Sequence, residues 1–173
     1  EAGFAPRGIE PAPEVARQAS ERAGCPVRVG TLEDAIFEAC SLDVITAFDV
    51  LEHVPTVGEA LTRLRFALAP GGLLAVTVPD FGGLWARGSG ARWPFLTPWE
   101  HVLYFTRRTL RGTLMRAGFE DVTFHPTQTP VSFGTLAVKS PLPDVLVPDA
   151  VRHRGVGLPF GTLFAIARAP GID

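Results

Sequence analysis

The chain has 173 residues, of which 46% are hydrophobic and 20% charged, and this composition is typical of a folded domain. Sixteen basic against eighteen acidic residues leave a net charge of −2, which offers no electrostatic case for nucleic acid or an anionic membrane. No apolar run approaches the roughly 18 residues of a membrane span, and the N-terminus lacks a secretory signal pattern. Cys25 and Cys40 stand alone, which predicts reduced thiols in a cytoplasmic protein.

In the first half of the chain, short apolar runs alternate with helical patterns. The helical patterns have apolar side chains at three- and four-residue spacing and end at glycines. The run 73–78 is apolar throughout, which predicts a strand covered on both faces. We predict strands over 7–10, 25–30, 42–48 and 73–78, helices over 12–24 and 57–69, and a loop with a weak helix over 31–37.

The second half begins with residues 80–105, which are rich in glycine and aromatic side chains and predict a lid-like loop. A helix over 106–118 follows, with Thr106 as its N-cap. Residues 126–159 hold many prolines and little periodicity, which indicates an insertion. Strands are predicted over 119–125 and 161–169. Strands that alternate with helices predict one α/β domain with a parallel sheet.

Several short stretches resemble motifs of other protein classes, but their sequence context does not match what those motifs require. The glycines of 155–161 precede a strand, whereas a phosphate loop opens a helix. The serine of 87–90 lacks the pattern of a nucleophile elbow. The four histidines, at positions 53, 101, 125 and 153, are too scattered in sequence to predict a metal site. We therefore predict no metal, no phosphate loop and no covalent nucleophile.

Three predicted strands are followed by acidic or aromatic residues. These are Glu10, then Glu33 and Asp34, then Phe48 and Asp49. In open parallel sheets, ligands bind outside the carboxyl ends of the strands, and an acidic residue there can accept from both hydroxyls of a ribose. In dinucleotide folds this residue follows a glycine loop by about 20 positions. Counted back from Glu10, such a loop would lie before residue 1.

The combination of FDVLEHVP (48–55), LAPGGLLAVTVPD (68–80) and EHVLYFTRRTLRGTLMRAGFEDV (100–122) resembles class I S-adenosylmethionine-dependent methyltransferases. It is most similar to the ubiquinone-biosynthesis-type O-methyltransferases and related type 11/23 methyltransferases. The resemblance runs from about Gly8 to Val122 and includes the last predicted strand. It implies a Rossmann-like, doubly wound, mostly parallel sheet with an antiparallel last strand and helices on both faces.

The resemblance implies roles for residues that match the family's cofactor site. Glu10 matches the acidic residue that binds the ribose hydroxyls of S-adenosylmethionine. Phe48 and Asp49 match positions next to the methionine part and the methyl group. The adenine site would be lined by Leu32, Glu33 and Asp34.

On the acceptor side, the resemblance implies fewer assignments. Glu52 and His53 are typical of the subgroup, and we weigh His53 as a general base against a histidine that caps the next helix. His101 is a candidate for substrate contact. Four aromatic residues form either an apolar cover for the substrate or a satellite core: Trp85, Trp93, Phe95 and Trp99.

One part of the family pattern has no counterpart in this sequence. The family's glycine-rich loop would lie before residue 1, and in the family's sheet the first strand stands between the strands predicted here over 7–10 and 42–48. We therefore expect one N-terminally incomplete methyltransferase domain with a lid at 80–105 and an insertion at 126–159, or a gap filled by swapping or by a homodimer.

The expected function is methyl transfer to a small-molecule or lipid-like acceptor at oxygen. The alternative is a degenerate, non-catalytic binding or assembly module. Neither nucleic acid nor stable membrane insertion is expected.

Overall fold

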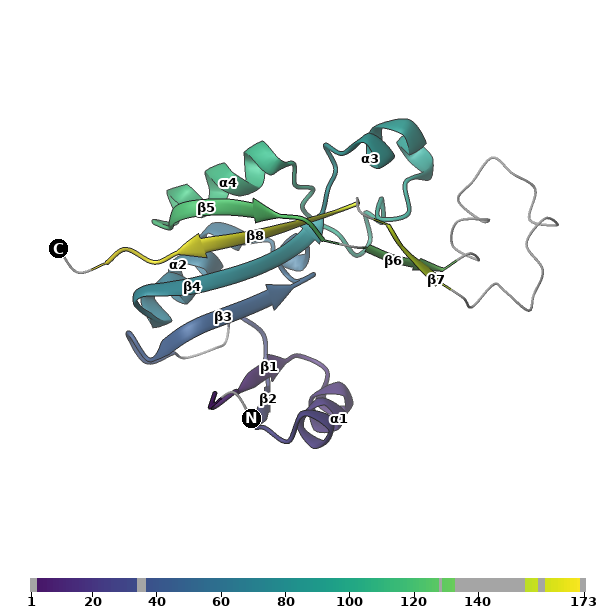
Figure 1. The fold of residues 1–173 in the computed structure, drawn as a ribbon. Coiled ribbons are helices and arrows are strands. Elements are labelled where there is room, and N and C mark those ends of the chain that lie inside the picture. The colour runs from purple at the N-terminus through teal and green to yellow at the C-terminus, as the bar shows by residue number, and fades with distance from the viewer. Residues whose placement is uncertain (1–2, 34–36, 128, 133–154, 159–160, 172–173) are drawn as a thin grey trace. The chain divides into compact units, whose positions relative to one another are not determined.

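The computed structural model describes residues 3–33, 37–127, 129–132, 155–158 and 161–171 (Figure 1). The chain divides into two compact units, Glu1–Glu38 and Ala39–Asp173. Part of the weak helix predicted over 31–37 and most of the insertion lie outside the described residues. None of the helices in the described ranges is long and apolar enough to cross a membrane.

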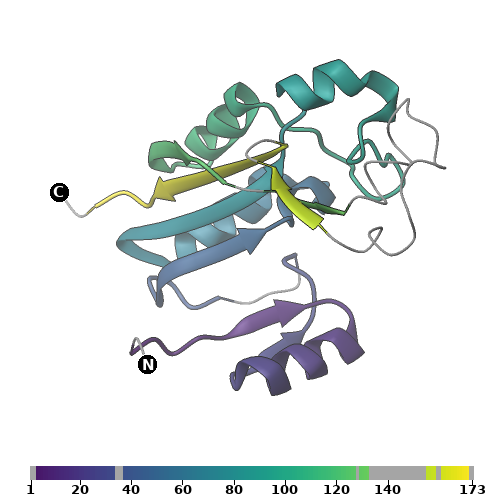
Figure 2. The ribbon, with the colours of Figure 1, turned by 45° about the vertical axis from the view of Figure 1, so that its right-hand side comes forward.

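The described residues of the first unit form one helix and a pair of short parallel strands (Figure 2). β1 (Gly8–Glu10) pairs in parallel with β2 (Val27–Val29), and both contact α1 (Pro13–Ala23). Pro13 occupies the first turn of α1, where its missing N–H costs nothing. Gly24 ends the helix in the left-handed conformation at φ 64°. These elements confirm the predicted helix and both predicted strands.

The second unit is built on a four-stranded sheet with the order β3-β4-β8-β5. Its strands are β3 (Leu42–Phe48), β4 (Leu68–Pro79), β5 (Glu120–His125) and β8 (Thr162–Arg168). β3 runs parallel to β4, whereas β8 runs antiparallel to both β4 and β5. The sheet is therefore mixed, with an antiparallel last strand as predicted. Within the described residues β3 pairs only with β4, so its other edge carries no partner strand there.

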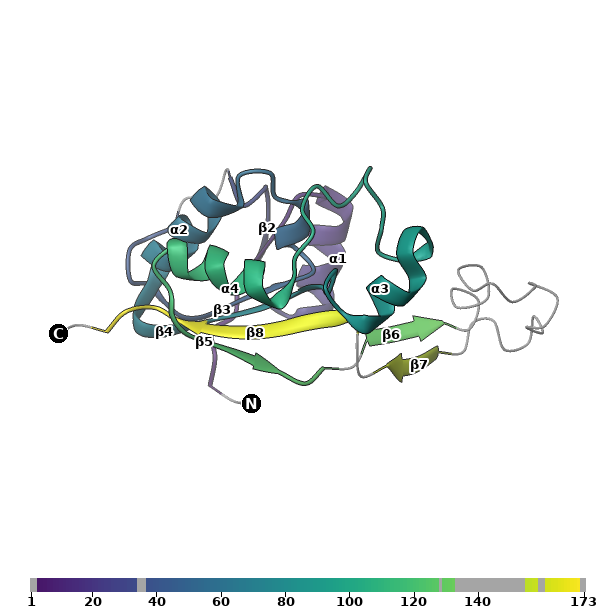
Figure 3. The same cartoon turned by 90° about the horizontal axis from the view of Figure 1, so that it is seen from above.

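The two long helices of this unit, α2 (Val57–Ala67) and α4 (Arg107–Arg116), lie on the same face of the sheet (Figure 3). Leu61 and Leu64 of α2 and Leu110 and Leu114 of α4 are almost fully buried. Alternate residues of β4 share this burial: Leu74, Val76 and Val78. The residues between them are partly exposed, so the apolar run that predicted cover on both faces is fully buried on one face only.

β4 begins earlier than predicted, directly after α2 ends at Ala67. The register against β3 shifts between Leu42 and Val44, which leaves extra residues of β4 in a bulge. Gly71 adopts φ 74° within this bulge, a conformation that favours glycine. The two glycines that were expected to end the helix therefore shape the strand instead.

Two other segments contain more structure than their sequences indicated. The lid segment 80–105 includes a short helix, α3 (Leu84–Ser89), and a 3-10 turn, η2 (Gly90–Arg92). At the ends of the insertion, β6 (Thr129–Ser132) pairs antiparallel with β7 (Gly155–Leu158). Two of the glycines considered as a phosphate loop therefore lie in a strand.

The N-cap of α4 can be tested by mutation. Thr109 N–H donates to Thr106 Oγ1, and Thr106 N–H donates to Thr109 Oγ1. Replacing Thr106 with alanine removes one acceptor, so we expect Thr106→Ala to lower the free energy of unfolding by about 1 kcal/mol in urea denaturation. Thr106→Ser keeps the oxygen and is the control. Equal losses in the two variants would contradict the capping role.

Candidate functional site

In the first unit, Glu10 stands at the carboxyl end of β1. Its Oε1 accepts a hydrogen bond from Ala12 N–H at 3.0 Å, and its backbone carbonyl accepts from Gly30 N–H at 3.1 Å. The side chain is half-buried. The bond to Ala12 holds the carboxylate at the end of the strand, where a ligand of a parallel sheet binds.

The neighbouring strand β2 ends next to β1, because Glu10 is in register with Val29. Leu32 and Glu33 follow in a turn, Leu32 half-buried and Glu33 exposed. The structure therefore brings Glu10 and the Leu32–Glu33 turn together at the carboxyl ends of the two strands of this small parallel sheet. Asp34, the third residue assigned to the adenine site, lies outside the described residues.

In the second unit, the chain turns sharply after β3 at Asp49, which adopts φ 54°. Aspartate is among the few side chains that tolerate this left-handed conformation. The turn is held by β4, because Asp49 N–H donates to the carbonyl of Thr77 and Thr77 Oγ1 donates to Asp49 Oδ1, both at 3.0 Å. Phe48, just before the turn, is 53% exposed, and its ring meets that of Phe164 edge-on.

A single turn of 3-10 helix, η1 (Leu51–His53), follows, and its three side chains differ sharply in their exposure to solvent. Leu51 is fully buried and Glu52 is 1% exposed, whereas His53 is exposed. The backbone carbonyl of Glu52 accepts from Val102 N–H at 3.0 Å and from Leu103 N–H at 3.1 Å. This residue therefore ties the lid segment to the end of β3.

His53 and His101 come together although 47 residues separate them in sequence, because the lid returns to η1. Their ring centroids lie 4.8 Å apart. One potential ligand atom from each of Glu52, His53 and His101 lies within 4.8 Å of the others. Distance in sequence had argued against a histidine cluster, and folding removes that argument. The predicted absence of a metal stays untested.

Hydrogen bonds to backbone carbonyls orient both imidazole rings. His53 Nδ1 donates to the carbonyl of Glu100, and His101 Nδ1 donates to that of Phe95, each at 2.8 Å. A carbonyl oxygen only accepts, so in the neutral rings the lone pair is on Nε2. His53 does not cap α2, whose N-cap is Thr56. The cluster thus presents two basic nitrogens and a carboxylate.

Aromatic side chains of the lid pack into a contiguous cluster. Trp93 is buried, and its ring lies 5.5 Å from Phe95 and 5.8 Å from Phe81 between centroids. Phe95 also contacts Trp85, while Phe81 contacts Tyr104. Trp99 is 78% exposed. Of the four aromatic residues considered as a substrate cover or a satellite core, Trp93 is buried, Trp85 and Phe95 are half-buried and in contact with each other, and Trp99 is exposed.

Tyr104 joins the aromatic cluster to the histidines, with its ring 6.3 Å from that of His101. Among the described residues, four buried side-chain atoms have no hydrogen-bond partner: Glu52 Oε2, Trp93 Nε1, Thr97 Oγ1 and Tyr104 Oη. Buried polar atoms in folded proteins are almost always paired. All four belong to the lid or to the residue that anchors it.

Burial also changes the acidity of Glu52. The loss of water on burial, together with a smaller effect of the negative charge of Asp49, raises the pKa of its carboxyl group to about 7, against the opposing effects of its own backbone N–H and of His53. A carboxyl group that titrates near neutrality is typical of functional sites.

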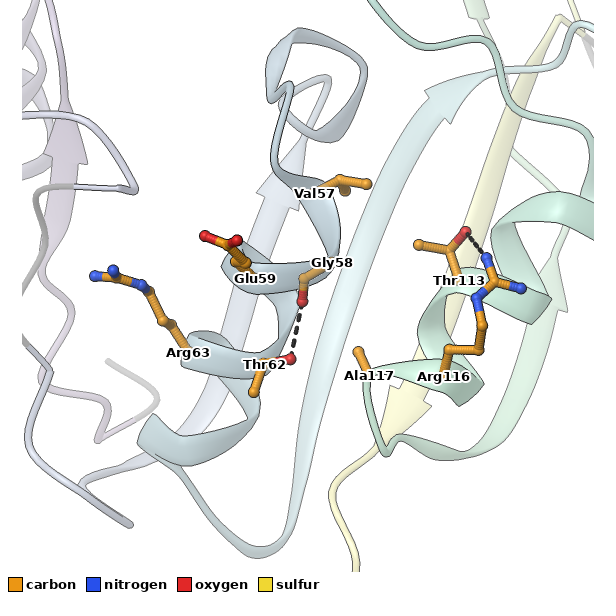
Figure 4. Close-up of a pocket in the computed structure, with 8 residues that line it drawn as sticks. All are labelled: Val57, Gly58, Glu59, Thr62, Arg63, Thr113, Arg116 and Ala117. Atoms are coloured by element: carbon orange, nitrogen blue, oxygen red, sulfur yellow. Dashed lines mark hydrogen bonds between the residues drawn. The ribbon is translucent and has the colours of Figure 1, made fainter.

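A separate groove of about 720 Å³ lies between α2 and α4 (Figure 4). Thr62 donates to the carbonyl of Gly58 and Arg116 donates to Thr113, while Glu59 and Arg63 point away from α4. None of the residues predicted for cofactor or acceptor binding lines it. The lining residues are Val57, Gly58, Glu59, Thr62, Arg63, Thr113, Arg116 and Ala117.

Known proteins share both the sequence pattern and the fold. The family described as a methyltransferase domain matches residues 1–123. A ubiquinone biosynthesis O-methyltransferase of Methylobacterium sp. (strain 4-46) is 30% identical over 139 residues, covering 69% of this chain. The chain spans 54% of the length of that relative.

Two solved structures share the fold. A SAM-dependent methyltransferase of Thermotoga maritima has a TM-score of 0.66 at 18% identity, covering 94% of this chain and 72% of its own. The YcgJ protein of Bacillus subtilis has a TM-score of 0.65 at 12% identity, covering 96% and 82%. The chain therefore belongs to the class I S-adenosylmethionine-dependent methyltransferase family, as the resemblance implied.

Sequence reasoning missed the buried position of Glu52 and the part played by Tyr104 and Thr97. The signal available for Glu52 was its place among the apolar residues of Val50–Val54. No comparable signal marked Thr97 or Tyr104. Both residues are half-buried, and their hydroxyl oxygens are buried by the packing of the lid.

The raised pKa of Glu52 predicts how stability depends on pH. The folded state holds the proton more tightly than the unfolded chain, whose pKa is near 4.5, so stability is lost as pH rises from about 4.5 to about 7. We expect the melting temperature in a chelating buffer to fall by several degrees over this range, and the fall to shrink in Glu52→Gln. Glu59→Gln, on the exposed face of α2, is the matched control. The same pH profile in wild type and Glu52→Gln would refute the assignment.

Proposed function

We propose that the protein transfers a methyl group from S-adenosylmethionine to a hydroxyl oxygen of a small-molecule or lipid-like acceptor. The observation that carries the proposal is the cluster of Glu52, His53 and His101 at the end of β3, beside the aromatic lid, in a chain of the methyltransferase family. A hydroxyl acceptor must lose a proton, and this cluster offers groups that can take it.

The residues of the second unit fit the acceptor side of such a reaction. S-adenosylmethionine supplies the activated methyl group when bound. Methyl transfer requires mainly alignment of the acceptor oxygen and exclusion of water, to which the half-buried lid contributes. His53 Nε2 accepts the proton of the hydroxyl as the new oxygen–carbon bond forms, and His101 contacts the acceptor.

The cofactor side rests on residues at strand ends. Glu10 would accept hydrogen bonds from the ribose hydroxyls, because its carboxylate is already held at the end of β1. Leu32, Glu33 and Asp34 would line the adenine site. Phe48 and Asp49 would stand next to the methionine part, and the left-handed turn at Asp49 presents that backbone at the strand end.

The alternative function is a non-catalytic binding or assembly module of the same family. The open edge of β3 within the described residues favours it, because unpaired strand edges are sites of association. Cofactor binding separates the two functions, since a degenerate module has no need of the strand-end carboxylate.

Calorimetric titration with S-adenosylhomocysteine tests the cofactor assignment. We expect binding that weakens by about 10- to 100-fold in Glu10→Ala, because hydrogen bonds to a charged group are lost. Glu21→Ala removes an exposed carboxylate of α1 and is the matched control. Unchanged affinity in Glu10→Ala would refute the role of Glu10, and no binding by the folded wild-type chain would favour the non-catalytic module.

The proposed base is tested by methyl-transfer assays with labelled S-adenosylmethionine and a panel containing a phenol, a catechol and a long-chain alcohol. Loss of a general base typically costs 10²- to 10⁴-fold, so we expect His53→Gln to slow ether formation by about this factor. Binding of S-adenosylhomocysteine should be retained. A normal rate in His53→Gln would remove this residue from the mechanism, and methylation at nitrogen or carbon would refute the hydroxyl acceptor.

A further inference from the structure

We propose that Glu52, His53 and His101 form a binding site for a divalent transition-metal cation of the zinc class. The three residues come from two segments, η1 and the lid, and their potential ligand atoms lie within 4.8 Å of one another. Two imidazole nitrogens and one carboxylate oxygen are a donor set that zinc and its first-row neighbours accept. Magnesium and calcium prefer oxygen ligands alone, so they are poorer candidates.

The orientation of the imidazoles supports this assignment. Both rings donate Nδ1–H to a backbone carbonyl, His53 to Glu100 and His101 to Phe95. Histidines that ligate metals usually donate their second nitrogen in this way, which fixes the tautomer and makes the ligand nitrogen more basic. The lone pair required for coordination is therefore on Nε2 in both residues.

The buried carboxylate of Glu52 supports a cation site independently of the two imidazoles. Glu52 is 1% exposed, yet its Oε2 has no hydrogen-bond partner among the described residues. No ion pair to Glu52 occurs among the described residues either. Burying a carboxylate in this condition is costly, and a cation beside it removes most of the cost.

The potential ligand atoms would have to move only slightly closer together to bind one ion. Zinc–nitrogen bonds of about 2.0–2.1 Å place the ligand atoms of a tetrahedral site about 3.3 Å apart. The atoms here are at most 4.8 Å apart, so side-chain rotation of the exposed His53 and the half-buried His101 can bring them together. Two hydrogen bonds from Val102 and Leu103 to the carbonyl of Glu52 hold the lid beside the cluster.

Three protein ligands leave at least one coordination position open, which is the arrangement of catalytic rather than structural zinc sites. The inference concerns the cluster alone and does not depend on the reaction proposed above. A cation on His53 Nε2 occupies the lone pair proposed to accept the proton, so the metal-bound and metal-free chains are distinct states. A zinc ion held by these residues would make a coordinated hydroxyl more acidic, as zinc lowers the pKa of bound water to about 7.

The test is calorimetric titration of Zn²⁺ into the chelator-stripped chain, with Co²⁺ absorption as a second readout. We expect one ion per chain, binding at least about 100-fold weaker in His53→Ala and in His101→Ala, and a cobalt spectrum without a thiolate band. His125→Ala is the matched control, because His125 bonds to Thr123 on β5 outside the cluster. Melting temperatures show whether each variant is folded.

Two further variants complete the test. Glu52→Gln keeps the shape of the buried side chain and should weaken zinc binding while S-adenosylhomocysteine binding is unchanged. Cys40→Ser removes an exposed thiol and should leave zinc binding intact. Absence of zinc binding by the wild-type chain, unchanged affinity in both histidine variants, or loss of binding in Cys40→Ser would each overturn the proposal. Failure of methyl transfer with zinc binding retained would leave it standing.

Discussion

The chemistry of the second unit depends on the sharp turn that ends β3. Asp49 adopts a left-handed backbone conformation, and Thr77 of β4 holds it through both its backbone carbonyl and its hydroxyl. The turn sends Leu51 into the core and leaves Glu52 buried beside it, while His53 emerges at the surface. A residue unable to adopt positive φ at position 49 would strain the turn and displace the residues that follow.

At that turn, the backbone of Glu52 anchors the lid while its side chain is buried at an energetic cost. Its backbone carbonyl accepts from two N–H groups of the lid, which fixes the lid against the end of the sheet. Its side chain is thereby buried, which is unfavourable for a charged carboxylate and raises its pKa to about 7. Either a proton or a nearby cation relieves this cost. Lid anchoring therefore keeps this carboxyl group buried with Oε2 unpaired, and buried acidic groups with a raised pKa are typical of functional sites.

Local signals predicted much of the fold. The strand over 42–48 and the N-cap at Thr106 occur as expected, because alternation, capping oxygens and terminal glycines act over a few residues. Predictions failed where long-range contacts decided the outcome. The glycines after α2 looked like a helix stop, but pairing with β3 and β8 draws them into β4 as a bulge. The antiparallel pair β6 and β7 joins segments far apart in sequence, which no local pattern records.

The candidate site divides in the same way. Sequence by itself determined the family, the alternation of strands and helices, and the residues at strand ends, because each of these is written in neighbouring residues. Glu10, Asp49 and His53 could be named on that basis. Only the tertiary structure decided that His101 lies against His53, that Trp93 is core while Trp99 is exposed, and that Glu52 is buried with Oε2 unpaired. Burial and proximity arise from the return of the lid to the end of β3, and that return is settled by packing over the whole unit rather than by any one stretch of the chain.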